Sequence, residues 1–370
     1  MKSPIPARSI MTQVSPAEDR ADQDNLTLDG LSLVGAAAGR DDGVMPDNAT
    51  PATRPTQTVL ITGGTSGIGL AAARTVLRSP NGPWHVIVAN RDPARARAAV
   101  EELTRSAATG NTVESLAVNL ASLSSVRSFA GALTARVRSG QVPPIQAVIC
   151  NAGVQAGTEL TLTADGYEST FGVNHLAHFL LVNELVPVLQ APARVVVVAS
   201  DTHDPAMKTG VPAPAWSTAT DLAYGRLGPL GQKDSAFIAG QRRYSTSKLA
   251  NIVFTYELAR RLPAGITANA FNPGLVPGTG LQRSAPAPVR FISQHILPRM
   301  TWLVRRVVTP NVHTAEESGS ALARLAIDPA LAGTTGKYFD GREIASSSAE
   351  SYDMPRATEL WETSTELAHP

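Results

Sequence analysis

From Thr58 onward, short apolar runs rich in Val and Ile alternate with longer stretches rich in Ala, Leu and Arg. Apolar runs bounded by turn residues are typical of strands buried on both faces of a parallel sheet, and the stretches Pro93–Arg105 and Ser122–Arg138 have helical spacing. This alternation predicts an α/β fold with a doubly wound parallel sheet of the Rossmann type, whose ligands bind at the carboxyl ends of the strands. The expected strands are TVLITGG, WHVIVANR, VESLAVNL, IQAVICNAG, ARVVVVAS, ITANAFNPG and GKYFDG.

Composition divides the chain into two parts. Residues 1–56 are rich in Pro, Asp, Ala and Thr, which predicts a disordered extension, or in part a misplaced start codon, since Met11 and Met45 also offer starts. Residues 57–370 are expected to form one domain. Two insertions in its substrate region are expected, at about 201–243 and 275–315.

Composition and charge also exclude several classes of protein. Lysine and arginine number 32, and aspartate and glutamate number 31, so there is no electrostatic reason to expect nucleic acid as a partner. Cys150 is the one cysteine of the sequence, which excludes an intramolecular disulfide and favours a cytoplasmic setting. Neither a membrane-spanning helix nor a secretory signal is expected from the distribution of apolar residues.

A Gly-rich turn, LITGGTSGIGLAAA, places Gly63, Gly67 and Gly69 after the first expected strand and at the start of a helix. Glycine permits a tight turn and lets backbone N–H groups approach a pyrophosphate, whose charge the helix N-terminus favours. The spacing differs from the commoner G-x-G-x-x-G, and many Gly-rich turns are only structural. The position of this turn in the first βαβ unit favours dinucleotide binding.

The second expected strand ends in VANRDP, with Asn90 and Arg91 where a protein selective for NAD carries an acidic residue. A carboxylate there would repel a 2′-phosphate, whereas a guanidinium offers a donor fork that suits phosphate. The simpler alternative is an exposed arginine at a strand end, and Asp92 would partly neutralise it. We expect NADP(H) as the cofactor, with Arg91 near its 2′-phosphate.

The stretch QRRYSTSKLAN is rich in polar groups and leaves three interpretations open. It is consistent with a polar helix surface, with a serine nucleophile in an S-x-x-K motif, or with a tyrosine held beside a lysine for proton transfer. Tyr244 and Lys248 are four residues apart and share one face of a helix. The KTG at Lys208–Gly210 precedes S-x-x-K instead of following it, and S-D-N is missing, which argues against a serine nucleophile.

Taken together, the motifs resemble those of the short-chain dehydrogenase/reductase family. TGGTSGIG, CNAG, FGVNHLAHFLL, VVVVAS, YSTSK and NPG occur in that family's order between about Thr58 and Leu367. CNAG, the long segment after VVVVAS, PGTGL and RATELWETSTEL resemble its protochlorophyllide oxidoreductase and retinol dehydrogenase branch. The resemblance implies a catalytic tetrad of Asn174, Ser200, Tyr244 and Lys248.

The resemblance also implies which residues contact the cofactor. Those of the Gly-rich turn are Gly63, Thr65, Ser66, Gly67, Ile68 and Gly69. The others are Arg91, Asn119, Leu120, Asn151, Ala152, Gly153, Tyr244, Lys248, Pro273 and Gly274. Asn119 departs from the family, which commonly has Asp near the adenine, but an amide also offers a hydrogen bond to the ring.

By the same resemblance, Tyr244 donates a proton to a carbonyl oxygen that Ser200 holds by a hydrogen bond, while NADPH delivers hydride to the carbon. Lys248 binds the ribose hydroxyls, and Asn174 positions a water that links Lys248 to solvent. An unperturbed tyrosine has a pKa of about 10. We expect the ammonium of Lys248 and the positive nicotinamide of the oxidised cofactor to lower it.

Other reactive residue types have simpler interpretations. His175 and His178 lack a carboxylate or cysteine at ligand spacing, so we expect helix packing or a subunit contact and no metal. Cys150 ends a buried strand and is interpreted as a small core residue. The light-driven protochlorophyllide enzymes usually carry a cysteine in the substrate region, and none occurs between Ser200 and Tyr244, which argues against pigment reduction.

Two segments are expected to surround a small-molecule substrate. Residues 201–243, with Trp216, Tyr224 and Phe237 as anchors, are interpreted as a pocket wall or as a surface loop, and leave both a monomer and a homodimer open. The segment after Gly274 is apolar and basic, which predicts an anionic lipophilic substrate, peripheral contact with a membrane, or an amphipathic helix that faces the core. Its arginines are Arg283, Arg290, Arg299, Arg305 and Arg306.

The sequence therefore predicts an NADP-dependent oxidoreductase that reduces a carbonyl group, or oxidises the alcohol, of a bulky apolar or polycyclic molecule. Within enzymes, the alternative is a protochlorophyllide-type reduction of a carbon–carbon double bond. From another class, the alternative is a non-catalytic protein that senses NADP. The intact Tyr244 and Lys248 argue against that last interpretation.

Overall fold

The structure is a computed structural model that describes residues 54–155, 157–277 and 311–369. Of the extension expected at residues 1–56, the described part is limited to residues 54–56. Most of the insertion expected at 275–315, with its five arginines, also lies outside the described residues.

The described residues form an eight-stranded sheet in the order β3-β2-β1-β4-β5-β6-β7-β8. Pairing is parallel from β3 through β7, and β8 runs antiparallel to β7. The predicted doubly wound α/β fold is confirmed, with the seven predicted strands as β1 to β7. The strands are β1 (Gln57–Thr62), β2 (Trp84–Asn90), β3 (Thr112–Ala117), β4 (Ile145–Cys150), β5 (Leu189–Val198), β6 (Ile266–Asn272), β7 (Lys337–Asp340) and β8 (Glu343–Ala345).

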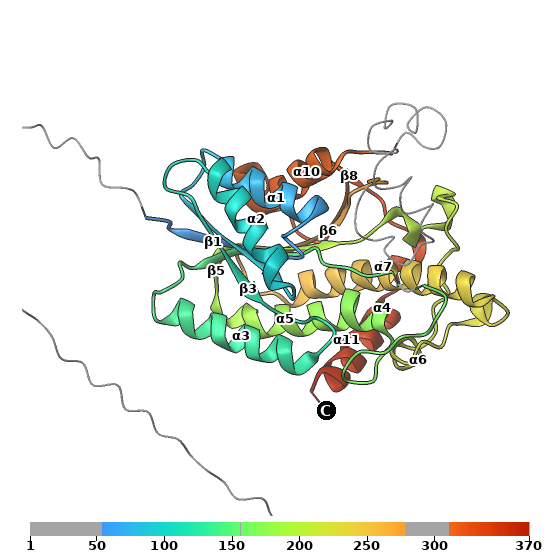
Figure 1. The fold of residues 1–370 in the computed structure, drawn as a ribbon. Coiled ribbons are helices and arrows are strands. Elements are labelled where there is room, and N and C mark those ends of the chain that lie inside the picture. The colour runs from blue at the N-terminus through green and yellow to red at the C-terminus, as the bar shows by residue number, and fades with distance from the viewer. Residues whose placement is uncertain (1–53, 156, 278–310, 370) are drawn as a thin grey trace, which may run out of the picture. The chain divides into compact units, whose positions relative to one another are not determined.

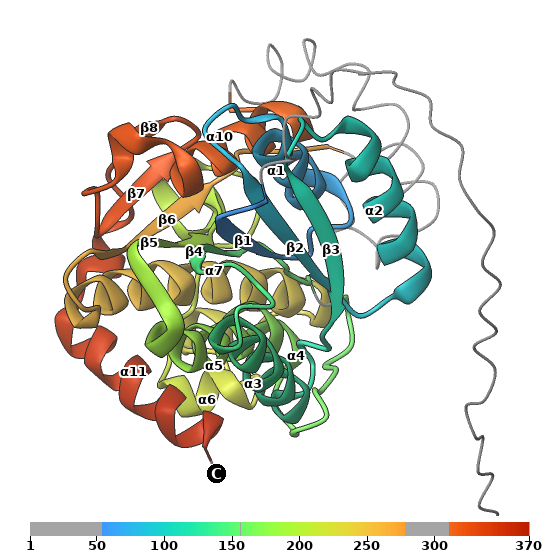
Figure 2. The same ribbon diagram turned by 90° about the vertical axis from the view of Figure 1, so that its left-hand side faces the viewer.

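Helices cover both faces of this sheet (Figure 1, Figure 2). One face carries α1, α2 and α10, and the other carries α3, α5 and α7, with α11 packed against α5 and α7. The helices are α1 (Gly67–Arg78), α2 (Pro93–Ser106), α3 (Leu123–Arg138), α4 (Ser169–Phe171), α5 (Ala177–Leu185), α6 (Ala219–Ala223), α7 (Ala236–Arg261), α10 (Ala315–Ile327) and α11 (Met354–Ala368).

The helices on both faces of the sheet explain why apolar residues follow one another without interruption along the strands. In β1, Leu60 belongs to the apolar layer beneath α3, α5 and α7, whereas Val59 and Ile61 belong to the layer beneath α1 and α10. Successive side chains of a strand point to opposite faces, so a strand covered on both sides needs apolar residues at every position. The run Val195–Val198 of β5 divides between the two layers in the same way.

The strand order reverses at β1, which lies between β2 and β4. In doubly wound sheets, ligands bind outside the carboxyl ends of the strands at such a switch point. The Gly-rich turn follows β1, the CNAG segment follows β4, and Ser200 follows β5. The fold therefore places these three motifs at one edge of the sheet.

Helices α1 and α10 pack closely because α10 has a glycine at the contact. A Cβ atom at Gly319 would lie 2.5 Å from the Cβ of Ala71 and 2.7 Å from the backbone nitrogen of Ala72. Backbone cannot yield to such an atom as a flexible side chain can. This contact holds α1, and the Gly-rich turn before it, against the rest of the domain.

We predict that Gly319→Ala lowers the free energy of unfolding by about 1–3 kcal/mol, because the added methyl group overpacks this contact. Gly131→Ala is the matched control, since Gly131 lies exposed in α3 and a Cβ there would meet no atom within 4 Å. The control should raise stability by about 0.5–1 kcal/mol. Urea unfolding of both variants measures the difference, and similar effects would contradict the close packing of α1 on α10.

Candidate active site

The Gly-rich turn between β1 and α1 has the geometry of an anion-binding loop. Gly63 and Gly67 have φ angles of +66° and +55°, a left-handed conformation that suits glycine. A Cβ atom at Gly69 would lie 2.5 Å from the Gly63 carbonyl oxygen, so a larger residue does not fit there. Ser66, the N-cap of α1, makes no side-chain capping bond, which leaves the first N–H groups of the helix free to meet a phosphate.

Hydrogen bonds join this turn to the neighbouring strand ends. The side-chain amide of Asn90 donates to the Thr65 hydroxyl at 2.7 Å. The Thr62 hydroxyl accepts from the backbone N–H groups of Asn151 and Ala152, both at 3.0 Å. The ends of β1, β2 and β4 are thus fixed around the expected cofactor site.

Three other expected cofactor contacts lie at the same edge. Asn119 is exposed after β3, and its side-chain oxygen accepts from the N–H of Ala121 at 3.2 Å. Leu120 is buried in the core beneath α3, and Ile68 packs against the apolar layer beneath α1. The side chains of Leu120 and Ile68 are therefore held by packing, and their contact with the cofactor stays a prediction.

Arg91 is exposed at the end of β2. Within the described ranges its guanidinium has no ion-pair partner, since Asp92 caps α2 instead by accepting from the N–H groups of Ala94 and Arg95 at 3.1 Å. The expected neutralisation of Arg91 by Asp92 is therefore not formed. A free guanidinium at this strand end can meet a 2′-phosphate.

The four residues of the expected tetrad come together at the carboxyl ends of β4 and β5. The Lys248 ammonium lies 5.6 Å from the centre of the Tyr244 ring. The Ser200 hydroxyl is near enough to the Tyr244 phenol to lower its pKa. A Cβ atom at Gly153 would lie 3.4 Å from the side-chain oxygen of Asn174 and 3.7 Å from Lys248 Nζ, so these two polar groups face the same strand end.

Asn174 lies in a π-helical turn, Gly172–Leu176, between α4 and α5. Its side-chain oxygen accepts from the N–H of Val154 at 2.7 Å, and its amide donates to the Val154 carbonyl at 2.9 Å. The same amide donates to the Ser247 hydroxyl of α7 at 3.0 Å. A π-turn adds one residue to a helical turn and is frequent at functional sites. Here it carries the Asn174 side chain to both the segment after β4 and α7.

Burial dominates the titration of Tyr244 and Lys248. Burial raises the pKa of the Tyr244 phenol, while the hydrogen bond with Ser200 lowers it and the charge of Asp201 raises it. Burial lowers the pKa of the Lys248 ammonium to about 8, and this ammonium donates to the Val198 carbonyl at 3.0 Å. In the protein without cofactor, the pKa of the Tyr244 phenol is raised and not lowered, because desolvation of the phenol is the largest cause.

The two histidines after Asn174 are buried packing residues with different partners. His178 Nδ1–H donates to the Asn174 carbonyl at 3.1 Å, so its Nε2 accepts from the Thr62 hydroxyl at 2.9 Å. His175 bonds the Ser364 hydroxyl of α11 at 2.9 Å. Burial lowers the pKa of His178 to about 4 and that of His175 to about 3, so both are neutral at pH 7. His178 therefore links β1 to the π-turn, a role that the sequence analysis did not predict. The one sequence signal for this role is its position four residues after Asn174.

The NPG segment after β6 is fixed to α10 and to the residues after β5. Gly274 has a φ angle of +71°, and the Pro273 carbonyl accepts from the Ser318 hydroxyl of α10 at 2.8 Å. The side-chain oxygen of Asn272 accepts from the backbone N–H groups of Gly274 and Asp201, both at 3.1 Å. The segment therefore supports the turn that carries Ser200.

The serine-nucleophile interpretation does not fit the geometry. Ser245 and Ser247 are buried in α7 and donate to the backbone carbonyls of Gln241 and Tyr244. Lys208, which begins the KTG sequence, is exposed in a left-handed turn. Cys150 is buried at the end of β4, where burial raises the pKa of its thiol to about 12, as expected for a core residue.

Residues 201–235 form short turns and α6, which packs against α11, whereas residues 236–243, with Phe237, belong to the first turns of α7. Trp216 packs against the core, with the Arg356 guanidinium of α11 4.8 Å from its ring centre. The Tyr224 ring lies 5.8 Å from that of Tyr167, whereas Phe237 is 54% exposed and anchors nothing by burial. Two of the three expected anchors therefore pack, and the segment as a pocket wall stays a prediction.

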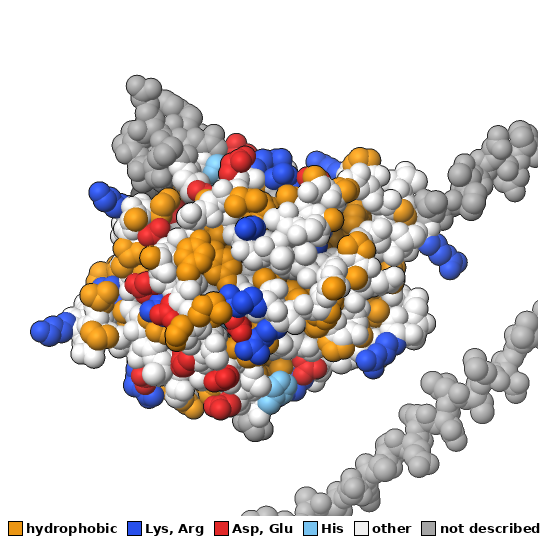
Figure 3. All heavy atoms as spheres, turned by 180° about the vertical axis from the view of Figure 1, so that it is seen from behind, with side chains coloured by type: hydrophobic (Ala, Val, Ile, Leu, Met, Phe, Trp, Pro, Cys, Tyr) orange, Lys and Arg blue, Asp and Glu red, His pale blue; other side chains and the backbone are white. Residues whose placement is uncertain are grey.

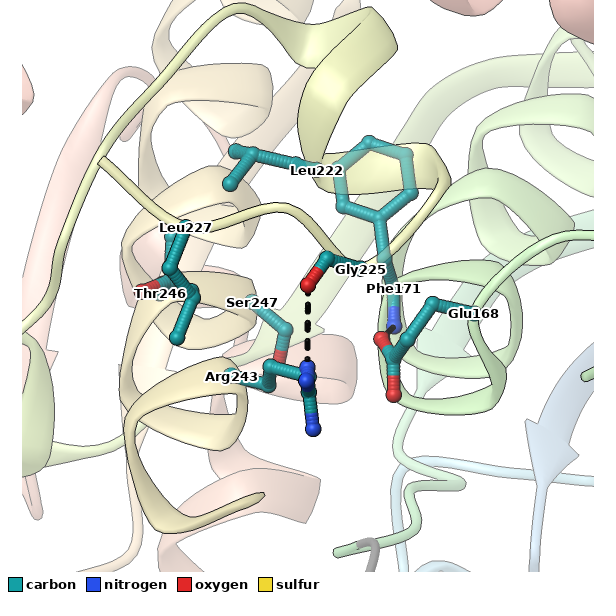
Figure 4. Close-up of a pocket in the computed structure, with 8 residues that line it drawn as sticks. All are labelled: Glu168, Phe171, Leu222, Gly225, Leu227, Arg243, Thr246 and Ser247. Carbon is teal, nitrogen blue, oxygen red and sulfur yellow. Dashed lines mark hydrogen bonds between the residues drawn. The ribbon is translucent and has the colours of Figure 1, made fainter. Parts of the chain in front are cut away.

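A small cavity lies beside α7, on the face that carries Arg243 and Ser247 (Figure 4). The Glu168 carboxylate accepts from the N–H groups of Thr170 and Phe171 at 2.9 and 2.7 Å and caps α4. Arg243 Nε donates to the Gly225 carbonyl at 3.2 Å. Ser247, which lines this cavity, also accepts from the side-chain amide of Asn174. The cavity therefore lies directly behind a residue of the tetrad.

The described surface carries charges of both signs. On the face shown in Figure 3, acidic and basic side chains are interspersed with small hydrophobic groups. In the part of the chain that the structure describes, no helix has both the length and the apolar character needed to span a bilayer.

Comparison with known proteins gives two matching family models. The model described as short chain dehydrogenase matches residues 57–212, and that described as AcuH dehydrogenase domain matches residues 281–369. Retinol dehydrogenase 13 of Homo sapiens is 33% identical over 347 residues, which cover 92% of this chain and 94% of that protein.

Two further similarities concern a plant enzyme and a solved structure. Protochlorophyllide reductase A, chloroplastic, of Oryza sativa subsp. japonica is 33% identical over 328 residues, covering 84% of this chain and 80% of that protein. A blue fluorescent protein from a metagenomic library, solved in complex with NADPH, has the same fold with a TM-score of 0.53. It is 23% identical and covers 77% of this chain and 97% of its own.

We predict that Lys248→Met changes stability in a pH-dependent way. Lys248 titrates near pH 8 when folded and near its ordinary value of 10.5 when unfolded, so between these values the unfolded chain binds more protons. The wild type therefore gains stability from this group as the pH rises, and the variant does not. The stability of Lys248→Met relative to wild type should fall by about 1–2 kcal/mol between pH 7 and pH 9.5.

Calorimetric unfolding at the two pH values measures this change. Lys233→Met, at an exposed position, is the control and should show the same small effect at both. A relative stability of Lys248→Met that does not depend on pH would contradict a desolvated ammonium at residue 248.

Proposed function

Because the chain belongs to the short-chain dehydrogenase/reductase family, we propose that it is an NADPH-dependent oxidoreductase that reduces a carbonyl group, or oxidises the corresponding alcohol, of a bulky apolar or polycyclic molecule. The observation that carries this proposal is the meeting of the four tetrad residues beside the Gly-rich turn. A buried tyrosine and a buried lysine at one strand edge are costly for stability, and proton transfer to a bound substrate gives a reason for them.

The cofactor proposal rests on the turn and on Arg91. The left-handed glycines and the uncapped start of α1 suit a pyrophosphate. The guanidinium of Arg91, which has no ion pair with any other described residue, suits a 2′-phosphate, and this supports NADP(H) over NAD(H). When bound, NADPH supplies the hydride that reaches the carbonyl carbon.

The protein's own residues would manage the proton. The phenol of Tyr244, which burial keeps protonated at pH 7, would donate to the carbonyl oxygen. Ser200 lies beside the phenol and would hold the same oxygen. The Lys248 ammonium beneath the ring would stabilise the phenolate that remains, and Asn174 would position water near Lys248. General acid catalysis of this kind contributes about 10²–10⁴-fold to a rate.

An apolar rim supports the substrate class. Val154 and Leu275, which follow β4 and β6, are 37% and 40% exposed. The Gln155 side chain donates to that of Gln241, which lies one turn before Tyr244 on α7. The apolar part of a substrate would contact Val154 and Leu275, and a polar group of the same substrate would form a hydrogen bond with the Gln155–Gln241 pair. The single buried cysteine supports a cytoplasmic setting.

The similarity to protochlorophyllide reductase A favours reduction of a carbon–carbon double bond as the second candidate function. The same tyrosine would then protonate carbon. Turnover of protochlorophyllide that requires light and stops in darkness would support this candidate over carbonyl reduction.

We predict that Tyr244→Phe lowers the rate of NADPH oxidation about 10²–10⁴-fold with any carbonyl compound that the wild type reduces, because the proton donor is lost. A panel of apolar and polycyclic ketones and aldehydes, followed by NADPH absorbance, finds that compound. Tyr352→Phe, an exposed tyrosine that lies after β8 and outside both expected substrate segments, is the control and should keep wild-type rates. Tyr244-independent oxidation of NADPH would overturn the assignment. Binding of NADPH without turnover of any compound would favour the cofactor-sensing alternative.

We predict that Arg91→Asp shifts cofactor preference from NADPH toward NADH, because a carboxylate repels the 2′-phosphate and accepts from a 2′-hydroxyl. Dissociation constants for both cofactors, measured by fluorescence titration, give the ratio without a known substrate. Arg97→Asp, an equal change of charge farther along α2, is the control. An unchanged ratio in Arg91→Asp would contradict the contact with the 2′-phosphate.

A further inference from the structure

Gln241 continues the face of α7 that carries Tyr244 and Lys248. The three residues stand at positions i, i+3 and i+7 of the helix, so their side chains share one face. Tyr244 and Lys248 are buried, and Gln241 is half-buried. The side chain that follows the phenol along this face, on the side away from the ammonium, is therefore an amide.

Gln155 brings a second amide to the same place from the segment after β4. Its side chain donates to the side-chain oxygen of Gln241. The residue before it, Val154, has two backbone hydrogen bonds to the side chain of Asn174, at 2.7 and 2.9 Å. The segment that carries Gln155 is thus attached to one residue of the tetrad, and its amide meets the helix that carries two others.

The amide pair, Gln155 and Gln241, keeps hydrogen-bonding groups to spare. A primary amide offers two N–H donors and a carbonyl acceptor. One N–H of Gln155 and the carbonyl of Gln241 are used in the bond between them, and in the described part of the chain neither side chain has a further partner. The pair therefore still offers both a donor and an acceptor to a ligand.

Neutral groups surround these spare donors and acceptors. The two arginines that follow Gln241 on α7 are bonded elsewhere, Arg242 to the Asp234 carboxylate and Arg243 to the Gly225 carbonyl. An amide binds a hydroxyl or carbonyl oxygen without the counter-charge that a desolvated carboxylate requires. The amide pair therefore suits a neutral oxygen of a ligand.

We propose that Gln155 and Gln241 are specificity-determining residues that bind a second oxygen of the substrate, separate from the carbonyl that reacts. The inference rests on the proposed function, which places the reacting carbonyl at Tyr244. Since Gln241 and Tyr244 leave α7 one turn apart, the two oxygens of the substrate are expected about 5 Å apart. That spacing fits a ketone with a hydroxyl or carbonyl group on its β or γ carbon and an otherwise apolar skeleton, which would contact Val154 and Leu275.

The test uses ketones in matched pairs that differ by one hydroxyl group, such as 1-tetralone and 4-hydroxy-1-tetralone, with further pairs on larger polycyclic skeletons. Calorimetric titration of protein saturated with NADP⁺ gives both dissociation constants without turnover. The preference of the wild type for the hydroxylated ketone should exceed that of the double variant Gln155→Met, Gln241→Met about 5–50-fold, because the variant cannot bond the added hydroxyl. The same two compounds are compared in each protein, so the difference in their own hydration cancels.

Gln141→Met is the matched control, since Gln141 is an exposed glutamine between α3 and β4. It should keep the wild-type preference. An equal preference in the wild type and the double variant would overturn the proposal. Weaker binding of both ketones by the same factor would also overturn it, because the amide pair would then only hold two segments together.

A single variant tests the contact with Gln241 and serves also where the double variant does not fold. Gln241→Glu can still accept from Gln155, but a carboxylate accepts hydrogen bonds and does not donate them. It should raise the preference for 4-hydroxy-1-tetralone over 4-methoxy-1-tetralone, since a hydroxyl can donate and an ether cannot. An unchanged preference would count against the contact.

The outcome for the amide pair is separable from that for the proposed function. A preference that depends on Gln155 and Gln241, without NADPH oxidation by any of the ketones, would support the contact and count against carbonyl reduction. Reduction of both members of a pair, with a preference that does not depend on the amides, would do the reverse. If no ketone of any pair binds, the inference and the substrate class are both wrong.

Discussion

The buried ammonium of Lys248 fixes the geometry on which the candidate site depends. It donates to the carbonyl of Val198, the last residue of β5, and this carbonyl also accepts from Asn251 Nδ2 at 3.1 Å. Two side chains of α7, one turn apart, thereby attach the helix to the end of a central strand. Tyr244 lies one turn before Lys248 on the same face, so the attachment also sets where the phenol meets Ser200. Desolvation of the ammonium is the cost of this arrangement, as its lowered pKa shows.

Much of the fold was predictable because it depends on local signals. The Val and Ile runs predicted β1 to β7, and the helical spacing of Pro93–Arg105 and Ser122–Arg138 predicted α2 and α3. Strand β8 was missed because its three residues are largely exposed and pair with β7 by a tight antiparallel turn, which leaves no apolar run. The tetrad was predictable from motifs, and the structure brings its members together without showing their roles.

The details that decide the chemistry were not predictable, because they depend on contacts between distant segments. The π-turn at Asn174 exists through bonds to Val154, twenty residues earlier, and to Ser247 of α7. The pKa of Tyr244 follows burial by the whole fold, which the spacing of Tyr244 and Lys248 cannot reveal. The turn that carries Ser200 depends on β6, because the backbone N–H of Asp201 donates to the side chain of Asn272.

Three buried histidines near the tetrad do not titrate near pH 7, so they are not the source of a pH-dependent activity there. His175, His178 and His203 lie close to it, but burial lowers the pKa of each, and each is bonded to neutral partners. Protonation of any of them near pH 7 would require a second buried charge beside the Lys248 ammonium, which is unfavourable. Among the tetrad residues, Lys248 and Tyr244 are therefore the groups whose titration falls at basic pH. Because the Lys248 ammonium lies 5.6 Å from the centre of the Tyr244 ring, its protonation state affects the balance between the two protonation states of the phenol.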